Sequence, residues 1–362
     1  MRRALTLLLT LTCLGLALAA QASAQTPVDP RGVGATDPNP LESLTFFNDT
    51  ESPSYESWRW LSNSGQQAKA DLVWKIAGQP KAIWLGRWTQ PNFAVKINRL
   101  IDAAKAAGSV PVFTVLRAEG QKCSPTYQGG GPAGDRATRA WYDDLARVLG
   151  DERVVIAFEP DSLGTIDCLA RSRRDDRLRL LRYGVDRLSQ LPNATVYLEG
   201  GASDWENAKR TANQLRAIGI AQVRGFMLNA THSDWTRENI EHGLEISRLT
   251  GGKHFVINTA ENGRGPVHYA LPNGKRGTQW CNPGLRGVGP APTTDTSHPK
   301  VDAYVWVNRP GYAQICQKRP IAWYLPRALE YARYATDWES APPGTRYGHA
   351  KRYPLRKFRI QR

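Results

Sequence analysis

The chain has 362 residues, of which 41% are hydrophobic and 12 are tryptophan, and its formal net charge is +15. This length is within reach of a single α/β barrel. The positive charge does not indicate a nucleic-acid partner, because seven of the cations and no acids lie in residues 341–362, which leaves the body only mildly basic.

Residues 1–24 are typical of a secretory signal peptide. Arg2 and Arg3 precede an apolar run at 4–20, and small residues follow at 22–24. A membrane anchor is the alternative, but the run is short and no stop-transfer pattern follows it. We therefore expect a secreted, extracellular, soluble protein. Its expected parts are a linker at 25–41, one catalytic domain at 42–340 and a basic tail at 341–362.

From residue 82 onwards, apolar β-forming runs alternate with helical patterns. The expected strands cover 82–85, 110–116, 154–159, 195–199, 225–229, 254–259 and 301–307. The expected helices cover 92–107, 136–149, 175–191, 205–218, 236–250 and 320–336. Apolar strands separated by helices predict a parallel sheet covered on both faces, and seven of them predict a distorted, TIM-like (β/α) barrel. Residues 262–299 show no convincing element, and a loop of this length in a compact domain is usually functional.

Polar residues follow five of these strands directly. They are Glu159-Pro160-Asp161, Glu199-Gly200-Gly201, Asn229-Ala230-Thr231, Asn258-Thr259-Ala260 and Asn308-Arg309-Pro310. The carboxyl ends of barrel strands meet on one face, which is where barrel enzymes place their chemistry. The sequence therefore predicts a site on that face.

Asp161 is the strongest candidate for a catalytic group. A carboxyl at the end of a buried strand is partly desolvated, which raises its pKa and keeps a proton that could be donated to a glycosidic oxygen. The alternative is that Asp161 caps the next helix. From the residues around it alone, both interpretations stand.

Four cysteines remain after the signal, Cys123, Cys168, Cys281 and Cys316. An even number in an exported protein predicts two disulfides, with three connectivities open. No pair has C-x-x-C spacing and the six histidines are scattered, so the sequence indicates no metal site and no cofactor.

An ordered set of segments resembles glycoside hydrolase family 6, the cellobiohydrolases and endoglucanases that cut β-1,4-glucan with inversion. The segments are Val110-Pro111-Val112-Phe113, Glu159-Pro160-Asp161-Ser162-Leu163, Tyr197-Leu198-Glu199-Gly200-Gly201, Gly225-Phe226-Met227-Leu228-Asn229, His254-Phe255-Val256-Ile257-Asn258-Thr259, Trp280-Cys281-Asn282-Pro283 and Val301-Asp302-Ala303-Tyr304-Val305-Trp306-Val307. Each segment is a weak signal by itself, but their order along most of the chain is specific.

The resemblance implies a role for each of several residues. Asp161 matches the family's proton donor. The residues expected to bind substrate are Trp84, Trp205 and Trp280 by stacking on glucosyl rings, Asn229 by its amide, and Asn308 and Tyr312. Core packing is the alternative for any single tryptophan. The resemblance also implies the disulfides Cys123–Cys168 and Cys281–Cys316, each of which would contribute about 3–4 kcal/mol.

Several positions depart from the family pattern. Lys122 replaces an aspartate that supports the acid, and a cation there would lower the pKa of a nearby carboxyl. Gln314 replaces the aspartate that best fits water activation, and an amide cannot take that proton. An inverting enzyme needs a second carboxylate roughly 6.5–9.5 Å from the acid. We expect Glu199 to be this base, with Asp204 and Glu261 as the other candidates.

Three functions are consistent with these departures. The first is a hydrolase of divergent specificity, the second a weak or inactive relative that binds cell-wall or plant glycan, and the third a structural wall protein. We expect a monomer with a polysaccharide partner, and the basic tail could also bind an anionic wall polymer. Lys122, Arg117 and Arg309 indicate an anionic or substituted glucan.

Overall fold

A computed structural model describes residues 28–89, 91–118, 132–270, 276–279, 282–313 and 322–340. The helices are α1 (Pro53–Asn63), α2 (Gln67–Ala77), α3 (Phe93–Ala106), α4 (Pro132–Leu149), α5 (Arg171–Leu188), α6 (Ala208–Ile218), α7 (Thr236–Leu249) and α8 (Leu325–Arg333), with short 3-10 turns η1 (Arg87–Thr89), η2 (Ile166–Cys168) and η3 (Ile220–Gln222). The long strands are β1 (Ile83–Gly86), β2 (Val112–Leu116), β3 (Val154–Phe158), β4 (Ala194–Glu199), β5 (Gly225–Leu228), β6 (His254–Asn258) and β9 (Val301–Val305). Within the described ranges, no helix has both the length and the apolar character needed to cross a bilayer.

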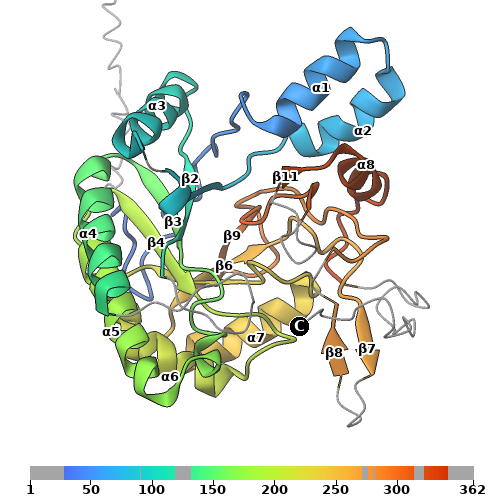
Figure 1. The fold of residues 1–362 in the computed structure, drawn as a ribbon. Helices are drawn as coiled ribbons and strands as arrows, with labels where there is room; N and C mark the ends of the chain where they lie inside the picture. Colours follow the sequence, from blue (N-terminus) through green and yellow to red (C-terminus); the bar gives the residue numbers. More distant parts are fainter. Residues whose placement is uncertain are drawn as a thin grey trace, which may run out of the picture.

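The seven long strands form one sheet in the order β1-β2-β3-β4-β5-β6-β9, and every neighbouring pair is parallel. Helices α3 to α7 wrap the outside of this curved sheet (Figure 1). This architecture confirms the distorted (β/α) barrel predicted from the sequence.

The first and last strands of the sheet approach each other at a seam. No ladder joins β1 to β9, but Ala82 N–H donates to the Trp306 carbonyl at 2.8 Å, and the Trp84 indole N–H donates to the Val307 carbonyl at 2.8 Å. The barrel is therefore nearly closed, and Trp84 helps to close it.

Side chains alternate between the two faces of each strand. On β3, Val154, Ile156 and Phe158 face the helices, whereas Val155 and Ala157 face the barrel interior. Both faces are apolar because both are covered, which is why the strands read as continuous apolar runs in the sequence.

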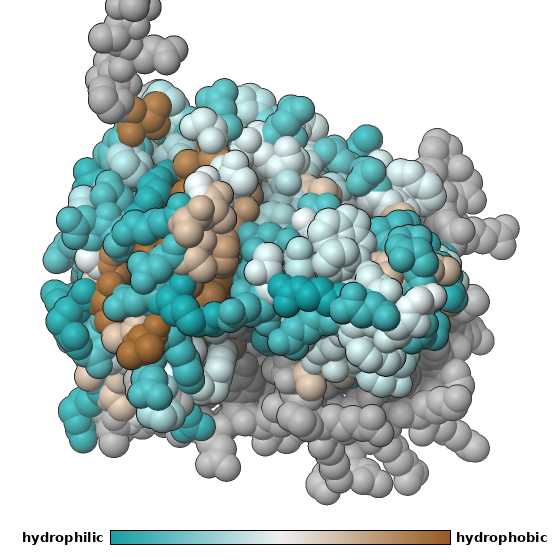
Figure 2. Space-filling view, turned by 90° about the horizontal axis from the view of Figure 1, so that it is seen from above, coloured by the Kyte–Doolittle hydropathy of each residue, from teal (hydrophilic) through white to brown (hydrophobic). Residues whose placement is uncertain are grey.

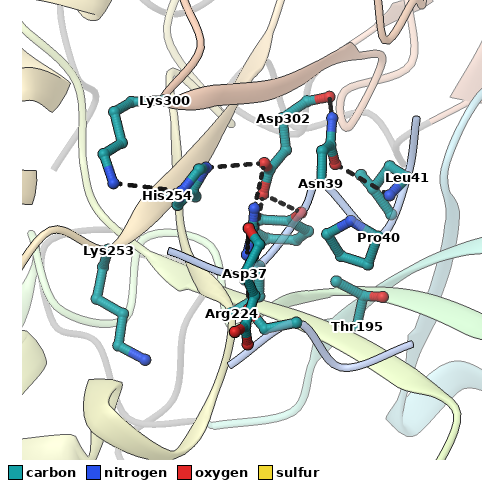
Figure 3. A network of polar contacts seen from close by, with 12 residues as sticks. Asp37, Asn39, Pro40, Leu41, Thr195, Arg224, Lys253, His254, Lys300 and Asp302 are labelled. Carbon is teal, nitrogen blue, oxygen red and sulfur yellow. Dashed lines mark hydrogen bonds and ion pairs between the residues drawn. The ribbon is translucent and has the colours of Figure 1, made fainter. Parts of the chain in front are cut away.

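A buried ion pair lies inside the barrel near the N-terminal ends of the strands (Figure 3). The Asp302 carboxylate accepts two hydrogen bonds from Arg224, at 2.7 and 2.8 Å, and others from Tyr197 and His254. Burial alone would raise the pKa of Asp302, but the hydrogen bonds from Arg224 and His254 outweigh it and hold that pKa below its usual value. A register shift between β6 and β9 at this position makes Asp302 an extra residue on β9. Such a bulge changes the direction of a side chain, so that Asp302 can face inward beside Ala303.

The segment before α1 is part of the domain, and not a free linker as residues 25–41 were expected to be. Arg224 donates to the carbonyl of Gly32, Lys253 to that of Val33, and Lys300 to that of Ala35. Leu41 is fully buried in the interior cluster. The reason is that these sheet residues need acceptors at the N-terminal end of the barrel, and the segment supplies them. This end is thereby covered, which leaves the opposite end for a site.

Two described features were not expected from the sequence. One is the helical hairpin α1–α2, which packs on α8 through a small apolar cluster that contains Leu61, Val73 and Leu325. The other is a two-stranded hairpin of β7 (His268–Ala270) and β8 (Arg276–Thr278), inside the segment expected to lack elements. Seen from above, apolar residues gather on the side where α3 and α4 lie, and the side of α1 and α2 is more polar (Figure 2).

Candidate active site

Three residues at the strand ends have an unusual backbone. Glu159, Asp161 and Asn229 have φ of 56°, 67° and 66°, in the left-handed region that residues other than glycine rarely adopt. The first two follow β3, and the third follows β5. Such conformations persist only where the surroundings enforce them, and they often occur at functional sites.

The Asp161 side chain is partly buried at the end of β3. Its Oδ1 accepts a hydrogen bond from the Thr231 hydroxyl, which follows β5. Burial raises the pKa of Asp161, while the Thr231 hydrogen bond and the nearby His232 lower it, and the net pKa is above its ordinary value. The η2 turn begins at Ile166, so Asp161 does not cap it. The geometry therefore favours the acid over the helix cap.

Glu199 lies beside Asp161, at the end of the neighbouring strand β4. Its Oε2 accepts the backbone N–H of Asp161 at 2.6 Å, and its Oε1 accepts that of Gly201 at 2.9 Å. Burial first, and then the charge of Asp161, raise the pKa of Glu199 well above its ordinary value. Two neighbouring carboxyls oppose each other's ionisation, which raises the pKa of the pair.

The Glu199 side chain is almost closed off from solvent, with the residue only 3% exposed. Its two oxygens fix the backbone that carries Asp161. This placement explains how the acid is positioned, and it leaves little room for a water molecule on Glu199.

A histidine lies on the same side of the site. His232 Nδ1 is 2.8 Å from Asp204 Oδ1, and the His232 ring stacks on Trp205 with centroids 4.8 Å apart and planes 15° apart. Burial alone would lower the pKa of His232, but the hydrogen bond and charge of Asp204 outweigh it and raise that pKa. Trp205 also lies against the backbone of Gly164, where an added Cβ would be 2.4 Å from its ring.

Glu159 supports the opposite side of the site. It is fully buried and accepts the backbone N–H groups of Arg117 and Ala118 and the hydroxyl of Tyr142. Burial raises the pKa of Glu159 against these hydrogen bonds. Arg117 is itself only 9% exposed, so it is not presented to a ligand as the sequence suggested.

Asn229 links neighbouring strand ends through hydrogen bonds and is not exposed to solvent. It is fully buried, and its amide N–H groups donate to the carbonyls of Asp234 and Asn258, while its Oδ1 accepts Asp234 N–H. All of its polar groups are used inside the protein, which argues against the expected sugar contact. Asn258 returns a hydrogen bond to the Asn229 carbonyl and accepts one from Asn308 N–H.

The seam between β1 and β9 gathers a second group of residues. The Arg309 guanidinium carbon lies 5.4 Å from the Trp84 ring centroid and 4.5 Å from that of Tyr312. The Asn308 amide donates to Glu261 Oε2 at 2.9 Å. Burial, against the charges of Arg327 and Arg309, raises the pKa of Glu261 to about 7.

The structure thus brings Asp161, Glu199 and Trp205 together, and places Trp84, Asn308 and Tyr312 together at the seam. The expected residues outside the described ranges are Lys122, Cys123, Trp280, Cys281, Gln314 and Cys316. Cys168 takes part in a disulfide, but its expected partner Cys123 is among those residues. The Cys123–Cys168 pairing stays a prediction.

The sequence reasoning named Thr231 only as part of a strand end and did not select His232. A signal for His232 was present, because it follows β5 within four residues of its end. Asp204, already named as an alternative base, lies five residues after the end of β4. Residues near the ends of neighbouring parallel strands must lie close together, whatever their separation in sequence.

Comparisons with known proteins agree with this architecture. The family described as Glycosyl hydrolases family 6 matches residues 42–315. Endoglucanase A of Cellulomonas fimi is 32% identical over 301 residues, which are 82% of this chain and 62% of that protein. Endoglucanase 1 of Streptomyces sp. strain KSM-9 is 31% identical over 296 residues, which are 78% of this chain and 79% of that protein. The chain therefore spans less than two thirds of the first of these relatives.

Solved structures show the same fold. The endoglucanase Cel6 from Mycobacterium tuberculosis, in complex with methyl-cellobiosyl-4-deoxy-4-thio-β-D-cellobioside, has a TM-score of 0.73 and 34% identity, and the match covers 82% of this chain and 99% of that one. The catalytic core domain of the cellobiohydrolase Cel6A from Chaetomium thermophilum has a TM-score of 0.68 and 21% identity, with 83% and 99% covered. At 21% identity the second likeness shows the fold alone.

Proposed function

Because the chain belongs to glycosyl hydrolases family 6, we propose that it hydrolyses β-1,4-linked glucan with inversion and that Asp161 is the proton donor. The observation that supports this most directly is the pairing of Asp161 with Glu199 at adjacent strand ends. Burial raises the pKa of each carboxyl above its ordinary value, which favours a protonated acid in the pair. The endoglucanases among its relatives support the substrate class.

In the proposed reaction, the Asp161 carboxyl gives its proton to the bridging oxygen as the glycosidic bond breaks. A water molecule attacks the anomeric carbon from the other face and loses its proton to a base. Thr231 fixes the rotamer of the acid through its hydroxyl. Glu199 fixes the backbone of the acid by accepting the N–H of Asp161.

From the sequence, Glu199 is the candidate for the base, with Glu261 and Asp204 as the alternatives. The near-complete burial of Glu199 supports a positioning role more directly than contact with water. Glu261 is also buried, but its pKa of about 7 would let it accept a proton near neutral pH. Secretion through residues 1–24 belongs to the same proposal, because β-glucan is an extracellular polymer.

The experiment uses two substrates that differ in leaving group. Asp161→Asn should lower kcat on a cello-oligosaccharide by about 10²–10⁴-fold, the range expected for one general acid. On an aryl cellobioside with an acidic phenol, the loss should be much smaller, because that leaving group departs without a proton. Replacement of the base should lower kcat on both substrates, and added azide should restore it.

Glu199→Gln, Glu261→Gln and Asp204→Asn, assayed in this way, would identify the base. Equal turnover by wild type and Asp161→Asn would refute the assignment of the acid. Binding of cello-oligosaccharides by wild type without any turnover would instead support an inactive, glycan-binding relative.

A further inference from the structure

We infer that Arg309 forms a subsite for a carboxylate carried by the glucan, so that the enzyme prefers chains containing glucuronosyl (C6-oxidised) residues to plain glucan. This inference rests on the proposed function for its substrate backbone. It adds recognition of a carboxylate on the substrate, which membership of the family does not imply.

The first observation is the position of Arg309. It follows β9 at the carboxyl end of the barrel, on the same face as Asp161, and lies at the seam beside Trp84 of β1. Its guanidinium lies over two aromatic rings, those of Trp84 and Tyr312. Stacking on both rings holds the planar group in one orientation and limits its motion.

The second observation is that these contacts use the faces of rings, and that no described residue accepts a hydrogen bond from the guanidinium N–H groups of Arg309. Among the residues that the structure describes, none accepts a side-chain hydrogen bond from Arg309 or forms an ion pair with it. Arginine has five N–H donors in a plane, and these match the two oxygens of a carboxylate. Burying a guanidinium without an anionic partner costs free energy. An anionic ligand that supplies this partner would therefore bind there with a net gain in free energy.

The third observation concerns the neighbouring acid. Glu261 is engaged by the Asn308 amide, and it does not form an ion pair with Arg309. Burial raises the pKa of Glu261 to about 7, so in mildly acidic solution it does not neutralise Arg309. The cation therefore remains available to a ligand.

Of the two other cations named in the sequence, Arg117 does not compete for this role. Arg117 is buried and donates through Nη1 to the Thr138 hydroxyl. Lys122 lies outside the described residues. Among the described residues, the preference for an anionic chain is thus assigned to one side chain, which makes it testable.

The experiment compares matched ligands. Cello-oligosaccharides and the same oligosaccharides with one glucuronosyl residue are assayed for kcat/KM with wild type, Arg309→Gln and Arg147→Gln. Arg147 is an exposed arginine on α4, and its substitution changes the net charge equally, far from the seam. Wild type and Arg147→Gln should prefer the carboxylated chain by about tenfold or more, equivalent to about 1.4 kcal/mol. Arg309→Gln should show no preference.

Arg309→Lys separates charge from geometry. Lysine keeps the charge but has no planar fork, so the preference should fall between those of wild type and Arg309→Gln. The same preference in Arg309→Gln as in wild type, or no preference in wild type, would overturn the inference. A sulfated oligosaccharide bound as tightly as the carboxylated one would also contradict it, because it would show a general anion site.

The affinities of both ligands are also measured by calorimetry on Asp161→Asn, with and without Arg309→Gln. This arm needs no turnover. If wild type hydrolyses neither chain, the proposed function fails, and the ratio of the two Kd values still decides whether Arg309 recognises a carboxylate.

Discussion

Substitution of Asp302 by asparagine tests the buried ion pair at the closed end of the barrel. The change keeps the shape of the side chain and removes its charge, which leaves Arg224 in a site where both partners have 0% side-chain exposure. Removing one partner of a buried pair costs about 3–5 kcal/mol, because the remaining charge is desolvated and unpaired. For a domain of roughly 300 residues, the entropy of unfolding is about 0.6 kcal/mol per kelvin, so Tm should fall by about 5–8 K.

The measurement is the free energy of unfolding from denaturant titration, with Tm from calorimetry. Asp186→Asn is the matched control, since Asp186 pairs with Arg182 on the surface of α5 and both side chains are more than 40% exposed. An exposed pair contributes about 0–1 kcal/mol. The hydrogen bonds of Arg224 to Gly32 and Asp37 also predict that Asp302→Asn makes the N-terminal segment more sensitive to protease.

The pH dependence provides an independent check. The pKa of Asp302 is lowered in the folded state, so its stabilisation is present above the ordinary aspartate pKa and is lost as pH falls through the folded value. The difference between wild type and Asp302→Asn should therefore shrink below about pH 4. If the variant unfolds within about 1 kcal/mol of wild type at pH 7, this account of the closed end is wrong.

Two further substitutions test the open end. Glu261 has a pKa raised to about 7, so the folded state is most stable while Glu261 is protonated, and stability should fall as pH rises from about 4.5 to 7. Glu261→Gln should abolish this pH-dependent loss of stability, which is at most about 3 kcal/mol. The measurement is the free energy of unfolding from urea titrations at several pH values. A pH profile of stability that is the same in the variant as in wild type would contradict the raised pKa of Glu261. Gly164→Ala would place a Cβ 2.4 Å from the Trp205 ring, so the indole must move, at a cost of about 1–3 kcal/mol. KM for cello-oligosaccharides should then rise, and an unaltered KM would argue against a substrate role for Trp205.

The sequence by itself determined the strands and singled out Asp161 as the candidate acid. Most residues of the seven strands are apolar, because both faces of a parallel sheet are covered, and such near-continuous apolar runs can be recognised without tertiary information. Asp161 could be singled out for a similar reason, since it directly follows the buried strand β3. The local sequence pattern was sufficient to recognise a feature wherever that feature depends on residues that are neighbours in the chain.

Only the tertiary structure decided which polar side chains remain available to bind a ligand. Asn229 and Arg117 have the residue types of ligand-binding groups, but contacts with segments distant in sequence use or bury them. Arg309 was already named from the sequence, and the seam distinguishes it from Arg117 by placing it over Trp84, more than 200 residues earlier in the chain. The hydrogen-bond partners of a side chain depend on which strands become neighbours, and a strand pattern read from sequence does not contain that information.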